Sequence, residues 1–196
     1  MNDSISEINQ RFASHMEHTA QAASQISGDI ANAANALVAT LLADGKIITC
    51  GNGNANTLAQ YFCTLLLNRF EQDRPALPAI NLGADGTTFS AICRDNRFND
   101  TFSRQVRAIG KSNDLLIVFV DDGHKANLLQ AVQAAHDRDM RVITISAREK
   151  TDVTSLLQPE DHEIALHNLE ANAAAPVMML IINTLCALID GQLFGT

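Results

Sequence analysis

KIITCGNGNANT, the stretch from Lys46 to Thr57, decides the fold of this chain. Its first five residues are mostly apolar and β-branched, which is typical of a strand buried on both faces. Gly51 and Gly53 follow, and glycine adopts backbone angles that other residues resist. The asparagines between and after them favour turns and helix starts. The stretch is therefore predicted to form a strand, a glycine turn and the start of a helix.

Such a junction directs backbone N–H groups and the positive end of a helix toward one point, which suits an anion such as a phosphate. The same pattern also suits a tight connection that binds nothing, and the turn alone does not separate the two interpretations. Gly51, Asn52, Gly53 and Asn54 are therefore candidate ligand-binding residues.

Composition narrows the class of protein. The 196 residues fit one domain, and 46% of them are hydrophobic, which is enough for a core. A net charge of −8 argues against a broad nucleic-acid-binding face. The polar N-terminus lacks the features of a signal peptide, and no apolar run reaches the roughly 18 residues of a membrane span, so we expect a cytoplasmic protein. The cysteines lie in apolar sequence at spacings unlike a metal site and are predicted to be buried free thiols: Cys50, Cys63, Cys93 and Cys186.

The first 45 residues are predicted to be a helical arm. Apolar side chains recur in steps of three and four across 4–43, which predicts either one long helix or two helices joined at Gly28, and Asp44-Gly45 is a stop signal. The helix is long for a globular protein, so we expect it to dock against another subunit, and thus to serve oligomerisation, or against a second helix. Residues 46–196 are predicted to form the domain proper.

From residue 46 onward, strands alternate with helices. The strands are expected at 46–50, 79–82, 114–120, 141–146 and 163–166, and the last helix at 171–193, with Pro176 in its first turn. This order predicts an α/β fold, an open parallel sheet with helices on both faces. Ligands bind such sheets beyond the carboxyl ends of the strands, where strand order reverses, which points to the turns 51–56 and 121–125.

Several motifs carry a resemblance to a known family. They are CGNG at 50–53, NRFE at 68–71, RPALPAI at 74–80, RQVRAIG at 104–110, Gly123 with Asn127, and LCALID at 185–190. With them the chain resembles, over essentially its whole length, the sugar-isomerase (SIS) domain family, in the group that contains phosphoheptose isomerase and the DnaA initiator-associating protein DiaA. The segments at 68–71, 74–78 and 188–194 look closer to DiaA. The resemblance implies a five-stranded parallel sheet and a homotetramer built through the N- and C-terminal helices.

An aldose–ketose isomerase needs a phosphate cradle, a general base, and an acid or metal that polarises the carbonyl. Aligned with the isomerases, the first-loop serine is Ala55 here, the histidine of the next helix is Tyr61, and the glutamate is Leu65. The Gln-Glu-x-His segment of the last helix corresponds to residues 175–178, which are Ala, Pro, Val and Met. The loop 120–125 has no hydroxyl; Asp121 and Asp122 put negative charge where a phosphate would lie, and Lys125 offsets part of it.

These substitutions predict a vestigial pocket with no catalytic residue, and zinc only if the chain is an isomerase after all. Besides the turn, Asp121, Asp122 and Lys125, the pocket includes Tyr61, which fills the vacated space or offers its hydroxyl to a ligand. It also includes Asp85, which caps a helix or binds the ligand. His124 beside the two aspartates is interpreted as a loop residue rather than a metal ligand.

The function expected from the resemblance is that of a non-catalytic tetramer that binds DnaA and promotes assembly of the replication-initiation complex, without direct nucleic-acid contact. Leu193 and Phe194 are then the partner-binding pair, or they fold back to cap the last helix. The alternative is a phosphoheptose isomerase, which converts sedoheptulose 7-phosphate to D-glycero-D-manno-heptose 7-phosphate, or a sugar-phosphate-binding module.

Overall fold

The computed structural model describes residues 2–95, 97–121, 125–167, 169 and 171–195. Its centre is a five-stranded sheet in the order β2-β1-β3-β4-β5, with every neighbouring pair parallel. The strands are β1 (Ile47–Gly51), β2 (Ala79–Asn81), β3 (Leu115–Val120), β4 (Arg141–Ser146) and β5 (His162–Ala165). The predicted open parallel α/β sheet is confirmed, and strand order reverses between β1 and β3.

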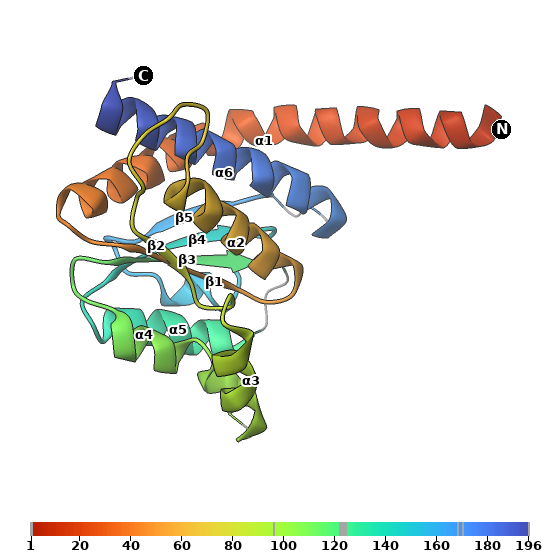
Figure 1. Ribbon diagram of the computed structural model, residues 1–196. Helices are drawn as coiled ribbons and strands as arrows, with labels where there is room; N and C mark the ends of the chain where they lie inside the picture. The colour runs from red at the N-terminus through yellow and green to blue at the C-terminus, as the bar shows by residue number, and fades with distance from the viewer. Residues whose placement is uncertain (1, 96, 122–124, 168, 170, 196) are drawn as a thin grey trace.

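Helices cover both faces of the sheet (Figure 1). One face carries α1 (Asn2–Leu42), α2 (Asn54–Leu67) and α6 (Ala171–Phe194). On the other side lie α3 (Gly86–Arg94), α4 (Ser103–Ile109) and α5 (Ala126–His136). Two short 3-10 turns, Phe98–Asp100 and Thr154–Leu156, complete the described elements.

The core forms two layers because side chains alternate across each strand. Leu115, Ile117 and Phe119 of β3 pack into the layer beneath α1, α2 and α6, whereas Leu116 and Val118 pack toward α4 and α5. All six residues of β3 are buried. This burial on both faces explains why the sequence of β3 is a continuous apolar run.

Helix α1 has two different environments. From Ala22 to Val38 it contributes buried side chains to the core, whereas its first half extends beyond the rest of the molecule (Figure 1). Of the two predicted forms the structure has the single long helix, which runs through Gly28 without a break. Relative to alanine, a glycine in a helix interior lowers helix stability by only about 1 kcal/mol, and the packing of α1 on either side of Gly28 offsets this loss.

Helix α6 begins at the predicted residue, but the predicted place of its proline is wrong. It starts at Ala171, so Pro176 lies inside the helix and not in its first turn. Because proline has no N–H, the carbonyl of Asn172 lacks its usual helical donor. From Asn172 to Phe194 the helix is long and apolar enough to cross a membrane. It is nevertheless a core helix here, because Ile182, Leu185 and Ile189 are fully buried in the core layer that α6 shares with α1 and α2.

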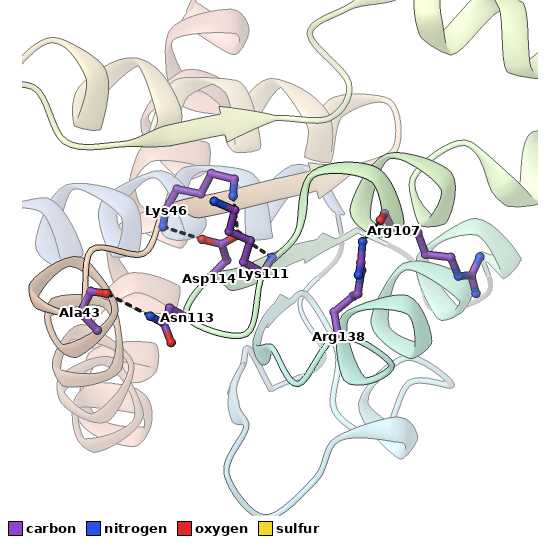
Figure 2. Close-up of polar contacts among 7 residues, drawn as sticks. All are labelled: Ala43, Lys46, Arg107, Lys111, Asn113, Asp114 and Arg138. Carbon is purple, nitrogen blue, oxygen red and sulfur yellow. Dashed lines mark hydrogen bonds and ion pairs between the residues drawn. The ribbon is translucent and has the colours of Figure 1, made fainter.

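The amino ends of β1 and β3 are tied together by Asp114 (Figure 2). Its carboxylate accepts hydrogen bonds from the backbone N–H of Lys46 at 2.9 Å and of Lys111 at 2.8 Å, and it pairs with the Lys46 ammonium. The side chain of Asn113 donates to the Ala43 carbonyl at 3.2 Å, which fixes the end of α1. These contacts fix the amino ends of β1 and β3, which are the strand ends opposite the candidate site.

Candidate functional site

The turn after β1 has the geometry that the sequence predicts. Gly53 has a φ of +52°, a left-handed conformation that favours glycine, and it precedes the first residue of α2. At Gly51 the constraint is space, because a Cβ would lie 2.8 Å from the carbonyl carbon of Ala55. Two backbone N–H groups are used within the turn: Ala55 donates to the Asn52 carbonyl at 3.0 Å, and Asn56 donates to the Gly53 carbonyl at 3.1 Å. These two backbone N–H groups therefore close the turn and are not available to a ligand.

A pair of amides fixes this turn to the neighbouring crossover. The Asn52 side chain donates to Asn127 Oδ1 at 2.9 Å, and Asn127 donates back to Asn52 Oδ1 at 2.8 Å. Asn127 is fully buried in the first turn of α5, and it also donates to the Thr101 hydroxyl at 3.3 Å. The pair thus links the carboxyl end of β1 to the segment that follows β3.

A cavity of about 340 Å³ opens at the carboxyl ends of β1 and β3, between α2 and α6. We call it the α2–α6 cavity. Its described lining is mostly apolar, with two amides and one carboxylate, and consists of Asn54, Ala55, Leu58, Asp121, Ala147, Asn172, Ala174, Ala175 and Met178. It lies at the reversal of strand order, where open α/β sheets bind ligands. Asp121 is the one ionisable side chain among these lining residues.

A second, smaller hollow of about 240 Å³ lies beside β1 on its β2 side. We call it the glycine hollow, and its described lining is Gly51, Asn52, Gly53, Asn56, Gly83, Gly86 and Phe89. The Asn56 Oδ1 atom is buried there without a hydrogen-bond partner among the described residues. The predicted turn residues are thus divided, since Asn54 lines the α2–α6 cavity and the other three line the glycine hollow.

Two further predicted residues make structural contacts. Tyr61 is half-buried, and its hydroxyl donates to Asn183 Oδ1 at 2.9 Å, which bridges α2 and α6. Asp85 caps α3 by accepting from the N–H groups of Thr87 and Thr88. The Thr88 hydroxyl and these backbone donors lower the pKa of the Asp85 carboxyl. Neither side chain lines the two hollows described above.

The remaining predicted residues are more scattered. Lys125 immediately precedes α5, whereas Asp122 and His124 lie outside the described residues. Leu193 and Phe194 form the end of α6; Leu193 packs against the core, and Phe194 is 39% exposed.

The thiols differ slightly from expectation. Cys50, Cys63 and Cys186 are buried as predicted, but Cys93 is only partly buried. Burial raises the pKa of the Cys63 thiol to about 11 and that of Cys186 to about 12. Cys93 lies on α3, which contributes no fully buried side chain, and this explains the difference.

Metal ligands do not gather in the part of the chain that the structure describes: no group of three or more His, Cys, Asp or Glu side chains is close enough to hold an ion. The α2–α6 cavity offers one carboxylate and two amides. This set does not fit zinc, which takes imidazole, thiolate or several carboxylate ligands.

Sequence reasoning missed Ala147 and Asn172 in the cavity lining. Both come from segments far along the chain, the end of β4 and the first turn of α6. The one signal for Asn172 is its polarity among apolar neighbours, and this is also what a helix start needs.

Comparison with known proteins identifies the family. A model of the SIS domain matches residues 11–147. A phosphoheptose isomerase of Chromohalobacter salexigens is 43% identical over 84% of this chain and 83% of its own. That of Methylococcus capsulatus is 38% identical over 96% of both chains. The solved phosphoheptose isomerase of Francisella tularensis superposes with a TM-score of 0.90 at 35% identity, over 95% of this chain and 98% of its own.

These relatives correct the function expected from the resemblance to DiaA. The interpretation of the chain as a non-catalytic tetramer that binds DnaA is wrong, because the relatives over most of its length are phosphoheptose isomerases. The preference for a chain without enzymatic activity loses its support for the same reason.

The segments that suggested DiaA have structural tasks. Arg74 forms a buried ion pair with Asp190, and the residues around them make the connection after α2 and the buried face of α6. Packing of this kind carries no information about a partner. The chain therefore belongs to the SIS domain family and, within it, to the phosphoheptose isomerase group.

Proposed function

We propose that this protein is an aldose–ketose isomerase that acts on sedoheptulose 7-phosphate, with the α2–α6 cavity as its sugar site. The observation that carries the proposal is the 38% identity to a phosphoheptose isomerase over 96% of both chains. Relatedness at this level, without large insertions or truncations, favours a shared substrate class.

The cavity supports the same conclusion by its place and its lining. It lies at the strand-order reversal, and its volume of about 340 Å³ is within the range of small-molecule sites. Asn54 and Asn172 offer amide donors and acceptors to sugar hydroxyls, while Leu58 and Met178 provide an apolar wall.

The reaction transfers a proton from C1 to C2 of the ketose. In our proposal the Asp121 carboxylate takes the C1 proton, the hydroxyl proton at O1 passes to O2 through the enediol, and Asp121 returns its proton to C2. One carboxylate suffices because it acts as base in the first step and as acid in the second. No step is assigned to zinc, because the described residues do not form a site for it.

The test is conversion of sedoheptulose 7-phosphate by the purified full chain in D2O, followed by NMR. Wild-type protein should produce the aldose, and it should incorporate deuterium at C2 wherever the proton held by Asp121 exchanges with D2O before it is returned. Asp121→Asn should lower turnover by about 100-fold or more, because loss of a general base costs about that much. Asp73→Asn, an exposed carboxylate in the connection after α2, is the matched control.

Absence of both product and deuterium incorporation with the wild-type protein would contradict the enzyme proposal. Full activity of Asp121→Asn would contradict only the assignment of the base.

A second candidate, binding of a sugar phosphate without conversion, is favoured by one observation. An isomerase needs several groups that transfer protons or polarise the carbonyl. Most of the described lining of the α2–α6 cavity is aliphatic, and Asp121 is its one ionisable side chain. This candidate predicts a thermal shift with sedoheptulose 7-phosphate and no deuterium incorporation at C2.

We also propose that the protein self-associates through α1 and α6. The first half of α1 exposes an apolar stripe of large side chains, which are Ile5, Ile8, Phe12 and Met16. On α6, Met179 and Leu180 are exposed as well. Contiguous apolar surface of this kind marks an interaction site, and a second copy of this chain is the partner that we propose.

A further inference from the structure

The phosphate of the proposed substrate needs donors that the turns of the α2–α6 cavity supply poorly. Two N–H groups of the turn after β1 close the turn itself. The loop 120–125 has no serine or threonine, and it carries the acidic residues Asp121 and Asp122. Carboxylates in this loop would repel a phosphate dianion bound beside them. If the proposed function holds, the phosphate of the substrate must bind at another place, outside these turns.

A shallow cavity of about 370 Å³ lies beside the α2–α6 cavity, where the first half of α1 passes the start of α6. We call it the α1–α6 notch. Its described lining is polar and comes from one face of α1 and the first turn of α6: Glu7, Gln10, Arg11, Ser14, His15, His18, Asn172 and Ala173. Residues three and four apart share a helix face, so these α1 side chains converge on the notch.

The notch collects groups that bind an anion. Arg11 brings a guanidinium, which binds phosphate through two parallel N–H donors. The Nδ1 atoms of His15 and His18 are buried and have no hydrogen-bond partner among the described residues. Both imidazoles also line the notch, and each ring carries an N–H group from which an anion can accept a hydrogen bond.

The amino end of α6 adds to this field. Asn172 and Ala173 belong to the first turn of a helix of 24 residues. The first N–H groups of such a helix have no partner within it, and the helix dipole places partial positive charge there. This helix end is thus directed at the same cavity as Arg11 and the two imidazoles.

One carboxylate opposes an anion in the notch. Glu7 Oε1 pairs with Arg11 Nη2 at 2.9 Å, and the two side chains are 64% and 72% exposed. An ion pair this exposed contributes little to stability. A phosphate dianion can therefore replace Glu7 as the partner of Arg11 at small cost.

We propose that the α1–α6 notch binds the phosphate of the sugar phosphate whose carbon chain lies in the α2–α6 cavity. Asn172 carries the argument, because it lines both cavities. It thereby joins a cavity that offers N–H donors to a mostly apolar one that holds a single carboxylate.

Isothermal titration of the full chain at low ionic strength tests this assignment with three probes: sedoheptulose 7-phosphate, sedoheptulose and inorganic phosphate. The phosphorylated sugar should bind more tightly than sedoheptulose, and inorganic phosphate should compete with it. Arg11→Ala should weaken binding of both phosphate-containing probes by about threefold to tenfold. The double change His15→Gln with His18→Gln should weaken it as well.

Glu7→Gln separates a binding role from a structural one. It removes the carboxylate that opposes the anion, so it should tighten phosphate binding by about twofold or more. Loss of a merely structural pair has no reason to raise affinity. Arg104→Ala, an exposed arginine on α4, is the control and should leave every affinity unchanged.

The outcomes separate this inference from the proposed function. Wild-type conversion of sedoheptulose 7-phosphate together with unchanged affinities in the Arg11 and Glu7 variants would overturn the notch and leave the enzyme proposal standing. Binding of inorganic phosphate that responds to these variants, without any binding of the sugar phosphate, would support the anion site and overturn the substrate. Absence of phosphate binding by the wild-type protein would overturn the notch outright.

Discussion

Arg74 shows how single residues connect the two helices that border the site. Its Nε donates to Asp190 Oδ1 at 2.8 Å, and the two side chains are 3% and 8% exposed. Its other nitrogens donate to the carbonyls of Leu65 and Leu66 at 2.9 and 2.7 Å. The guanidinium thereby caps the carboxyl end of α2 and holds α6 beside it, which positions the two walls of the α2–α6 cavity.

Removal of the carboxylate from this pair should destabilise the fold strongly. Asp190→Ala leaves the Arg74 charge buried without its counter-ion, and the free energy of unfolding should fall by about 3 kcal/mol. Urea denaturation of the full chain measures it. Asp73→Ala, in the exposed connection before Arg74, should change the same quantity by less than about 0.5 kcal/mol. Equal decreases in the free energy of unfolding of the two variants would show that the ion pair between Arg74 and Asp190 does not stabilise the fold.

At the scale of elements, the decisive contact joins the turn after β1 to the first turn of α5. The two elements are 75 residues apart at Asn52 and Asn127, yet their amides form a reciprocal pair. Because Asn127 is fully buried, its amide has no water to replace a lost partner. The pair therefore fixes the turn at the carboxyl end of β1 relative to the loop that follows β3.

Asn127→Ala tests this link. Unpairing Asn52 should cost about 1–3 kcal/mol and loosen the turn, so amide hydrogen exchange at residues 51–54 should become faster than in the wild type. Gln133→Ala, an exposed change on the same helix, should leave that exchange unchanged. Unaltered protection of the turn in Asn127→Ala would mean that Gly51 and Gly53 hold it without help.

For the whole molecule, the main question is what covers the first half of α1. Phe12 is 70% and Met16 is 67% exposed, although large apolar side chains of this kind are normally covered. In Figure 1 this half of the helix extends away from the body, and its apolar stripe is exposed. A second copy of the chain would bury it.

Phe12→Asp should therefore reduce the molar mass in solution, because it places a charge in the proposed interface. Light scattering coupled to gel filtration measures the mass directly. Ala13→Asp puts the same charge on another exposed face of α1 and should leave the assembly intact. A monomeric wild-type protein would contradict self-association.

Much of the fold is predictable from the sequence because its signals are local. The apolar run of β3, the glycine turn after β1 and the helical stripe of α2 each lie within a short window, and each was placed within a few residues. The misleading signals are also local in origin. A glycine at 28 and a proline at 176 normally end or begin helices, but the packing of α1 and α6 in the core overrides both signals.

The candidate site was less predictable. Gly51 and Asn52 were expected beside Asn54, yet they line a different hollow. The spacing of a motif does not say to which side of a strand each residue turns.

By itself, the sequence determined the alternation of strands and helices, the parallel sheet and, through its motifs, the SIS family. These features follow from periodicity and from short motifs, and each such signal lies within a short window of the chain. Only the tertiary structure decided that Asn172 borders two cavities and that His15 and His18 of α1 lie beside the start of α6. These residues are more than 150 positions apart, and their proximity depends on how α1 and α6 cross on the face of the sheet. The physical reason is that packing between distant elements depends on the shapes of whole faces, which no local pattern encodes.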